Sequence, residues 1–276
     1  MTPPRAARPF RRALMRGAAA LAMALAVLAP AQPADEPHAL VPFTAAAAGA
    51  PPAPWHFTTL PHKQPTRFDV VDLDGARVLR VQADASYGLL AHRVRLPLDA
   101  AAALAWRWRV DRFVEGADLH TRAGDDGAAK LCVFFDYPAE RLSLMERTRL
   151  ALARRLSGEA VPSEALCYVW DAHEAPGTVL ANAFTDRMRM MVLASGSAPS
   201  ADGWRAERRP LLADYRRAFG AEAGALAPDV AAVVVSADAD NTQAHGLAYF
   251  SDIALTGAAP PPAWQAGGRR TTGTAE

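Results

Sequence analysis

Residues 230–255 read VAAVVVSADADNTQAHGLAYFSDIAL, and the order of their segments decides which fold we expect. The run 230–237 is almost entirely apolar and has the length of a buried strand. An acidic loop at 238–242 separates it from a final strand at 246–255, in which Asp252 places a charge. A buried strand, a short polar loop and a closing strand are typical of an all-β protein.

A period-two alternation of apolar residues recurs along the chain and predicts further strands of ordinary length. These predicted strands are 78–83, 103–110, 130–137, 165–171 and 187–195. Turn-forming clusters of Asp and Gly, such as 72–75 and 124–127, separate several of them. Many strands and few helices predict an antiparallel β-sandwich of jelly-roll or galactose-binding-like type, not a βαβ sheet.

Two segments break this rhythm and predict helices. Within 139–157, four apolar side chains fall at helical spacing: Leu142, Met145, Leu152 and Leu156. Arg and Glu occupy other positions, so the segment is an amphipathic insertion. We expect it to pack on the sandwich with a solvated polar face, and a membrane-surface or lid helix is the alternative. A short second helix is expected at 211–219, where Gly220 ends it.

Residues 1–31 have the composition of a signal peptide. Five arginines precede the apolar run GAAALAMALAVLA, and Ala29-Pro30-Ala31 resembles a cleavage site. An uncleaved anchor is the alternative, although the run is short for a bilayer. We therefore expect a periplasmic or secreted protein, exported by the Sec route or, given the Arg11-Arg12 pair, by the twin-arginine route.

The remaining sequence predicts one folded domain with loosely attached ends. The Ala/Pro-rich segment 32–54 and the tail 257–276 have the composition of disordered chain. No linker divides 55–256, which is long enough for one core. Without the leader's five arginines, 25 basic residues face 29 acidic ones, a formal charge of 25 − 29 = −4. Arg supplies nearly all of the positive charge. This balance excludes the basic footprint of a nucleic-acid-binding protein, and the mature chain has no predicted transmembrane span.

The two cysteines, Cys132 and Cys167, both lie in predicted strands. In an exported protein they form a disulfide if their strands are neighbours. If the strands are apart, each is a small buried apolar side chain. The chain lacks a C-x-x-C motif, so neither cysteine indicates a redox pair or a zinc half-site.

The sequence carries no nucleophile elbow, P-loop or H-E-x-x-H motif. The pair Asp125 and Asp126 is the first acidic cluster, and paired carboxylates are the acid and base of glycoside cleavage. Neighbouring residues of an extended chain point to opposite faces, however, and Asp side chains in turns ordinarily cap backbone amides. We assign no catalytic residue and favour a non-catalytic role, with enzymatic activity left open.

The second acidic cluster, Asp238, Asp240 and Asn241, places oxygen ligands at the close spacing that suits calcium. Asp252 is a further candidate ligand, because a charge within a strand needs a partner, a metal or an exposed edge. The loop is not an EF-hand, and Asx residues are also common in plain loops. A structural calcium is the one cofactor that this pattern allows.

Trp106 and Trp108 share one face of a predicted strand, and Trp170 ends another. Aromatic rings on a sheet face stack against sugar rings, whose hydroxyls seek Asp, Asn and Arg. Large aromatic side chains are more often part of the core, and this is the interpretation we favour for the first two.

Several motifs in order resemble those of DUF3047, a family of exported proteins of unknown function. They are W-x-W at 106–108, GDD at 124–126, L-x-YVW at 166–170, W-x-x-E-x-R at 204–209, DYRRAFG at 214–220, DADNT at 238–242 and AYFSDI at 248–253. The resemblance covers about 55–255 and implies a single exported domain with no demonstrated activity. Lys130 and Ala239 depart from the family pattern, which often has Arg and Thr there. The final strand also resembles that of galactose-binding-like carbohydrate-binding modules, which implies a jelly-roll.

Three functions fit these observations. The first is non-catalytic binding of a carbohydrate or envelope glycan through the aromatic and acidic residues. The second is a glycan-active hydrolase or lyase that uses Asp125 or Asp126 with a carboxylate from 238–240. The third is an envelope assembly or interaction protein that uses the 139–157 helix on a partner or membrane. We rank them in that order, since β-sandwiches host many functions.

Overall fold

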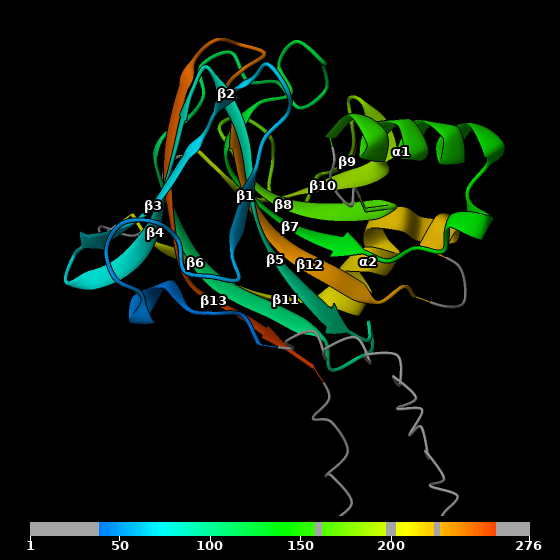
Figure 1. Cartoon of the computed structure of the whole chain (residues 1–276), viewed down its shortest axis with the longest axis horizontal. Helices are drawn as coiled ribbons and strands as arrows, with labels where there is room; N and C mark the ends of the chain where they lie inside the picture. The colour runs from blue at the N-terminus through cyan, green and yellow to red at the C-terminus, as the bar shows by residue number, and fades with distance from the viewer. Residues whose placement is uncertain (1–38, 158–161, 197–202, 224–226, 258–276) are drawn as a thin grey trace, which may run out of the picture. The chain divides into compact units, whose positions relative to one another are not determined.

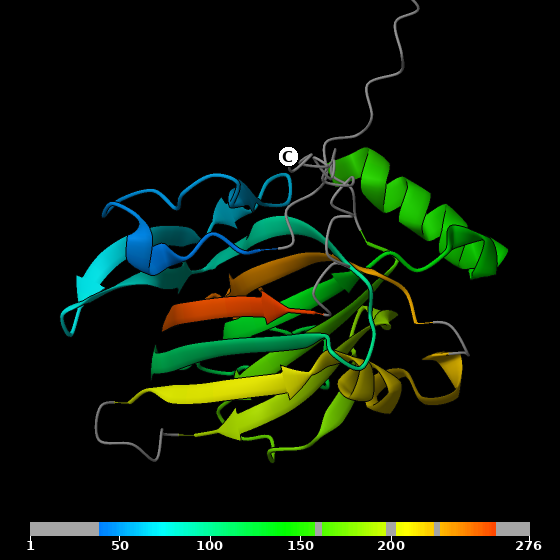
Figure 2. The same ribbon diagram turned by 90° about the horizontal axis from the view of Figure 1, so that it is seen from below.

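The computed structural model describes residues 39–157, 162–196, 203–223 and 227–257, and every structural statement below refers to these ranges. The predicted signal peptide, 1–31, lies outside the described residues, as does nearly all of the C-terminal tail. The described strands form two sheets that pack face to face (Figures 1 and 2). This confirms the predicted all-β sandwich of mostly antiparallel strands.

The small sheet contains five strands, and every pair of neighbours in it is antiparallel. In spatial order they are β11 (Arg205–Pro210), β6 (Ala103–Arg112), β13 (His245–Thr256), β4 (Ala76–Asp84) and β3 (Arg67–Leu73). The closing strand β13 therefore lies at the centre of this sheet, between β6 and β4.

The large sheet contains eight strands. Seven of them follow the order β1 (His56–Thr58), β5 (Ser86–Leu96), β12 (Val230–Asp238), β7 (Gly127–Phe135), β8 (Glu164–Asp171), β10 (Thr185–Ser195) and β9 (Val179–Asn182). The eighth, β2 (Gln64–Pro65), pairs with β5 in parallel, and β8 and β10 are also parallel. The 238–244 loop carries the chain from the large sheet at β12 to the small sheet at β13.

All seven strands predicted from the period-two pattern are present, but six others, β1, β2, β3, β5, β9 and β11, were not predicted, and β5 is the longest of them. Its residues alternate between the two faces of the sheet, yet its inward positions include Ser86, Gly88 and His92, which weaken the apolar signal. Gly88 is required by close packing, because a Cβ there would lie 2.8 Å from the Cβ of Thr66 and 2.9 Å from the ring of Phe57. A strand whose inward positions include a tightly packed glycine therefore lacks the alternating apolar pattern from which strands are predicted.

The sandwich interior holds the three candidate tryptophans. Trp106, Trp108 and Trp170 are at most 2% exposed, and the ring centroids of Trp108 and Trp170 lie 5.7 Å apart. Their burial corrects the proposal that these three tryptophans bind a ligand, because none of their three indole rings faces solvent. The physical reason is that β6 and β8 turn these positions toward the facing sheet, where aromatic side chains bury the most apolar area.

Part of the segment predicted to be disordered, 32–54, is ordered. Phe43 lies in the short 3₁₀ helix η1 (Phe43–Ala45) and packs against Trp55, with ring centroids 4.9 Å apart. Leu40 is also buried, and Gly49 forms an isolated bridge with Val70 of β3. Composition alone missed this segment, because a few apolar side chains anchor an otherwise Ala/Pro-rich stretch.

The predicted C-terminal-half helix is α2 (Leu211–Phe219), followed by η3 (Gly220–Ala223). Leu211, Tyr215 and Phe219 point into the core at helical spacing. Asp214 accepts hydrogen bonds from Arg209 at 2.6 and 2.7 Å and from the hydroxyl of Tyr168 at 2.9 Å. Gly220 ends the helix with φ 54°, a value that glycine adopts without strain.

The predicted inserted helix divides into η2 (Ala139–Arg141) and α1 (Leu144–Ser157). Ser143 and Glu146 form a capping box: the Glu146 amide donates to Oγ of Ser143 at 3.2 Å, and the Ser143 amide donates to Oε2 of Glu146 at 2.8 Å. Leu142 is buried, whereas Met145 and Leu152 are exposed. The expectation that the apolar face of this helix packs on the sandwich is therefore wrong for these two side chains. Leu156 lies among the residues whose side chains are not described.

The face of the large sheet that points away from the sandwich interior carries a second apolar cluster. Cys132 of β7 and Cys167 of β8 are paired directly across the two strands, and their sulfurs are joined in a disulfide of 2.04 Å. Around them lie further apolar side chains: Leu119, Val169, Met190, Val192, Ala232 and Val234. One end of this face is polar, and there the predicted acidic residues converge.

Candidate functional site

At one end of the outer face of the large sheet, strand register and the alternation of side chains bring polar residues together. Val233, Val235 and Ala237 of β12 point into the sandwich core, so Ser236 and Asp238 point outward. Tyr87 of β5 is opposite Asp238 on one side. On the other side, Lys130 of β7 is opposite Ser236. Tyr87, Asp238 and Lys130 thus lie on the same face of three neighbouring strands.

Lys130 and Asp238 form a buried ion pair at the floor of this site. The Nζ of Lys130 lies 2.8 Å from Oδ1 and 3.0 Å from Oδ2 of Asp238. Burial raises the pKa of Asp238 to about 6; Lys130 opposes this rise, and Asp126 and Asp125 add to it. Burial lowers the pKa of Lys130, but the nearby carboxylates of Asp238 and Asp125 outweigh it, so its pKa is raised overall. Lys130 is therefore a fixed positive charge.

Asp126 anchors the 238–244 loop. It is fully buried and accepts hydrogen bonds from the amide and hydroxyl of Thr242, both at 2.7 Å. Oδ1 of Asp126 also accepts two longer hydrogen bonds from Asn241, of 3.3 Å from its backbone amide and 3.2 Å from its side-chain Nδ2. The expected capping of backbone amides by an Asp is thus present, but the amides belong to a loop 115 residues further on.

Asp125 is placed differently from its neighbour. Its Oδ2 accepts a hydrogen bond of 2.7 Å from Nδ2 of Asn182, which ends β9. Its Oδ1 is buried and has no hydrogen-bond partner among the described residues. A buried carboxylate oxygen without a donor is costly, so this atom marks a place where a ligand donor would be stabilising.

The rim of the site reaches solvent. Asp240 is buried and pairs with Lys63, whose side chain is partly exposed. Asn241 is exposed, and Tyr87 and Asn182 are half-buried. Burial raises the pKa of Tyr87 to about 12, and the charge of Asp238 adds to the rise, so its hydroxyl stays protonated and can donate. We call these residues the lysine–carboxylate cluster: Lys63, Tyr87, Asp125, Asp126, Lys130, Asn182, Asp238, Asp240 and Asn241.

The structure brings five predicted residues into this cluster: Asp125, Asp126, Asp238, Asp240 and Asn241. It does not support the predicted calcium site of Asp238, Asp240 and Asp252. Asp252 lies at a bulge of β13, is exposed, and has Oδ2 3.7 Å from Nη1 of Arg107. No group of three or more His, Cys, Asp or Glu side chains among the described residues is arranged to hold a metal ion. Lys130 and Lys63 supply the positive charge that a cation would bring.

Sequence reasoning missed Lys63, Tyr87, Lys130 and Asn182. Of the 30 basic residues in the chain, only two are lysines, and both belong to the cluster. This scarcity was the available signal: lysine is a compact point charge with a flexible stem, whereas arginine is a planar fork, so the two are not interchangeable in a small buried site.

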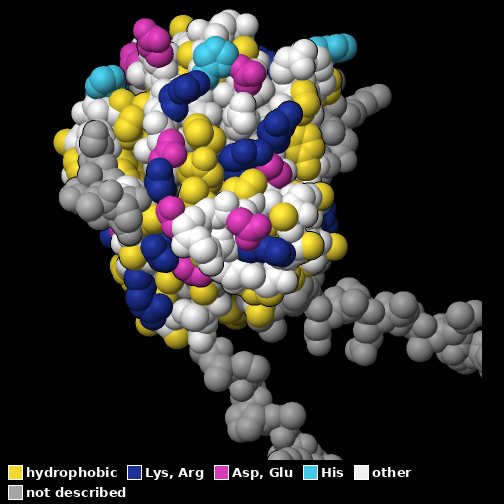
Figure 3. All heavy atoms as spheres, turned by 90° about the vertical axis from the view of Figure 1, so that its left-hand side faces the viewer, with side chains coloured by type: hydrophobic (Ala, Val, Ile, Leu, Met, Phe, Trp, Pro, Cys, Tyr) yellow, Lys and Arg dark blue, Asp and Glu magenta, His cyan; other side chains and the backbone are white. Residues whose placement is uncertain are grey.

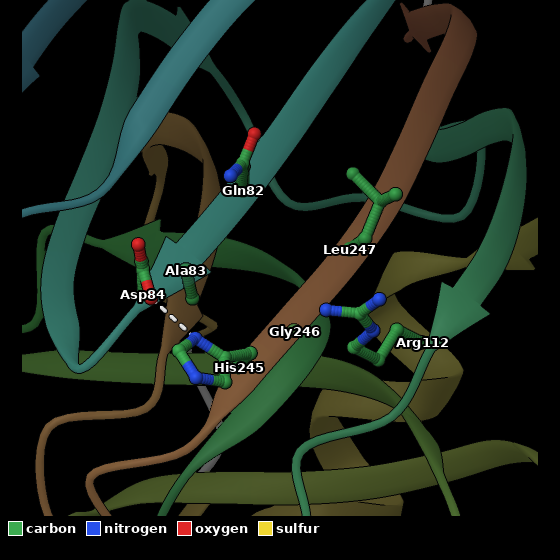
Figure 4. Close-up of a pocket in the computed structure, with 7 residues that line it drawn as sticks. All are labelled: Gln82, Ala83, Asp84, Arg112, His245, Gly246 and Leu247. Atoms are coloured by element: carbon green, nitrogen blue, oxygen red, sulfur yellow. Dashed lines mark ion pairs between the residues drawn. The ribbon is translucent and has the colours of Figure 1, made fainter.

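A separate surface pocket of about 330 Å³ lies on the small sheet (Figure 4). It is lined by Gln82, Ala83, Asp84, Arg112, His245, Gly246 and Leu247. Within it His245 forms an ion pair with Asp84. None of the predicted site residues lines this pocket, and its residues belong to β4, β6 and β13, not to the large sheet.

The side of the molecule that carries β3 and β4 shows basic, acidic and apolar side chains interspersed (Figure 3). In the small sheet, Arg80 of β4 forms an ion pair with Asp69 of β3, and Arg109 of β6 forms one with Asp111. Pairs that water partly reaches contribute little to stability, and side chains of opposite sign placed together form no surface of a single sign. Among the described residues, the lysine–carboxylate cluster is therefore the stronger candidate site.

Comparison with solved structures gives slight likenesses. The xyloglucanase domain of NopAA, a type three effector from Sinorhizobium fredii in complex with cellobiose, is 8% identical, with a TM-score of 0.39, over 74% of this chain and 98% of that one. Endoglucanase 3 of Trichoderma harzianum, from family GH12, is 10% identical, with a TM-score of 0.33, over 75% and 98%. Likenesses this slight carry no argument about the site. No curated protein matches the sequence.

Comparison with protein-family models identifies the family of this chain, which the comparison with solved structures does not. The model of the family described as "Protein of unknown function (DUF3047)" matches residues 53–254, which is most of the chain and includes every residue of the lysine–carboxylate cluster. The ordered motifs of the sequence had indicated the same family. The chain therefore belongs to DUF3047, a family of unknown function.

Proposed function

We propose that this protein binds a carbohydrate, without catalysis, at the lysine–carboxylate cluster. The observation that carries the proposal is the buried Oδ1 of Asp125, which has no hydrogen-bond donor among the described residues. A sugar hydroxyl would donate to this oxygen and remove the cost of leaving it unpaired. Three residues at the rim, Tyr87, Asn182 and Asn241, are half-buried or exposed.

The composition of the cluster fits a polyol better than an anion. A hydroxyl group both donates and accepts, and the cluster offers the carboxylate of Asp125 as acceptor and Tyr87, Lys63 and Asn241 as donors. Two ammonium groups face four carboxylates, a formal balance of 2 − 4 = −2, which repels acidic sugars. The half-buried ring of Tyr87 adds an apolar surface against which a sugar ring can stack.

Calorimetric titration of the purified protein with three probes tests the proposal: a neutral cello-oligosaccharide, an N-acetylated chito-oligosaccharide and an oligouronate. We expect binding of a neutral probe, weaker or no binding of the oligouronate, and at least about a tenfold loss of affinity for Asp125→Asn, because hydrogen bonds to charged groups contribute about 1.5–3 kcal/mol. Asp72→Asn, on the small sheet, is the matched control and should bind as the wild type does. If no probe binds, or if Asp125→Asn binds unchanged, the proposal is wrong.

A second candidate function is glycan hydrolysis, and the pKa of Asp238 favours it. Burial raises the pKa of Asp238 to about 6, and a carboxyl group with a raised pKa is the kind of acid that glycoside cleavage uses. Its ion pair with Lys130 opposes this role, since the ammonium holds the carboxylate charged. Release of reducing ends from a probe that binds, lost in Asp125→Asn, would establish hydrolysis; binding with no release would leave the non-catalytic function.

We also propose that the protein acts outside the cytoplasm. The signal-peptide composition of 1–31 motivates this, and the disulfide between Cys132 and Cys167 supports it, since such bonds persist in oxidising compartments. Among the described residues, no helix is long and apolar enough to cross a membrane. Recovery in a periplasmic or culture fraction of protein whose N-terminus lies near Gln32 would agree with export, and a full-length cytoplasmic protein would contradict it.

A further inference from the structure

The helix α1 turns its apolar stripe toward solvent. Leu144, Met145 and Leu152 are 77%, 63% and 55% exposed, which makes them the three most exposed large hydrophobic side chains among the described residues. Their spacing places them on one face of the helix, together with Thr148. Figures 1 and 2 both show α1 at the periphery of the molecule. An isolated exposed Leu needs no explanation, but three on one helical face do.

The opposite face of α1 holds the helix to the domain. Glu146 and Leu150, four residues apart, are its only half-buried side chains among those described. Glu146 lies 4.0 Å from the guanidinium of Arg187, which is also ion-paired with the buried Glu164. The capping box at Ser143 fixes the first turn. The face of α1 that carries Glu146 and Leu150 therefore lies toward the protein, and the face that carries Leu144, Met145 and Leu152 is turned outward.

The charge of the helical segment indicates what covers the apolar stripe. Residues 139–157 contain five arginines and two glutamates, a formal charge of 5 − 2 = +3. The chain from residue 32 onward has a formal charge of 25 − 29 = −4, so this segment is a basic region on an acidic protein. Arg141, Arg147 and Arg154 are exposed. An apolar face flanked by arginine is the composition of a helix that lies in the plane of an anionic membrane surface.

From this geometry we propose that α1 is an interfacial anchor that binds anionic lipid, with Leu144, Met145 and Leu152 inserted among the acyl chains and the arginines at the headgroups. Long basic side chains reach toward headgroups while their stems stay apolar. Binding combines buried apolar area with attraction to anionic lipid, and one short helix gives reversible attachment. The proposal is independent of the carbohydrate site, which lies on other elements of the fold.

Co-sedimentation of the purified protein with vesicles tests this proposal. Vesicles of equal parts phosphatidylcholine and phosphatidylglycerol should bind the protein, and vesicles of phosphatidylcholine alone should bind it at least about tenfold more weakly, because each basic residue near an anionic surface contributes several-fold. Raising the salt concentration should release the protein, because screening weakens attraction between exposed charges and the surface. Binding that is equal on both vesicles would overturn the role of charge.

Variants separate the apolar stripe from exposed apolar residues in general. The triple variant Leu144→Ser, Met145→Ser, Leu152→Ser should lose at least about tenfold in vesicle affinity and keep the wild-type melting temperature, since its side chains are already exposed. The control Leu60→Ser, Phe184→Ser changes exposed apolar residues elsewhere and should bind as the wild type does. No vesicle binding by the wild type, unchanged binding by the folded triple variant, or self-association that the triple variant abolishes would each overturn the proposal.

Discussion

The ammonium nitrogen of Lys130 lies 2.8 Å from Oδ1 and 3.0 Å from Oδ2 of Asp238, so one buried ion pair joins β7 to β12 on the outer face of the large sheet. Both side chains are almost completely buried. In a buried ion pair, each partner neutralises a charge that would be costly to bury alone. This neutralisation matters more for stability than the net attraction between the two groups. Its consequences for stability are therefore largest when one partner alone is removed.

Lys130→Met should destabilise the protein by about 3–5 kcal/mol, because it leaves the carboxylate of Asp238 buried without a counter-charge. Lys63→Met should cost about 1 kcal/mol or less, since the Lys63 side chain is 40% exposed and water replaces part of its interaction with Asp240. Urea unfolding of the two variants measures both values. Equal losses would contradict the distinction between a buried and a rim lysine.

Stability should depend on pH through Asp238. Its pKa in the folded protein is raised to about 6 by burial, above the ordinary value of 3.8, so the folded state binds this proton more tightly than the unfolded state. The stabilisation is present below about pH 4 and is lost as pH rises to about 6. The difference between the stability curves of wild type and Asp238→Asn should therefore change across this range, and a constant difference would contradict the raised pKa.

Asp126→Asn should destabilise the protein by about 2–4 kcal/mol, because a side-chain amide would replace the acceptor of the hydrogen bonds from Thr242 and Asn241. Asp125→Asn should cost about 1 kcal/mol or less, because Asp125 has one unpaired oxygen. Thermal unfolding separates these neighbours. A larger loss for Asp125 would show that its role is structural.

Replacing both cysteines by alanine should lower the free energy of unfolding by about 2–4 kcal/mol, since the bridge closes a segment with a sequence separation of 35. The check is guanidinium unfolding of oxidised wild type against the Cys132→Ala, Cys167→Ala variant. A variant as stable as the wild type would mean that packing of β7 on β8 alone sets the local stability.

Calcium should leave the melting temperature unchanged, and so should EDTA. A ligand that binds the folded state alone raises stability, but the described carboxylates of the cluster are held by Lys130, Lys63 and loop amides. Thermal unfolding in calcium, in EDTA and in neither provides the comparison. A rise with calcium that EDTA reverses would restore the predicted calcium site.

Most of the architecture could be predicted because the apolar pattern is local. All seven strands with a clear period-two signal formed, and 211–219 became α2. The strand β5 was missed because Ser86, Gly88 and His92 occupy its inward positions. The outward turn of Met145 and Leu152 was missed because periodicity identifies an apolar face and does not say what covers it.

By itself the amino-acid sequence determined the β-sandwich class, the family and the identity of the acidic residues, since these depend on spacing along the chain. Only the tertiary structure decided which of those residues meet. Asp126 reaches Thr242 across 116 positions, and the strand register places Tyr87 opposite Asp238. The tertiary structure also buries Trp106 and Trp108 in the core and places Asp252 beside Arg107. The reason is that strand order and register are set by packing between distant segments, which a local pattern does not contain.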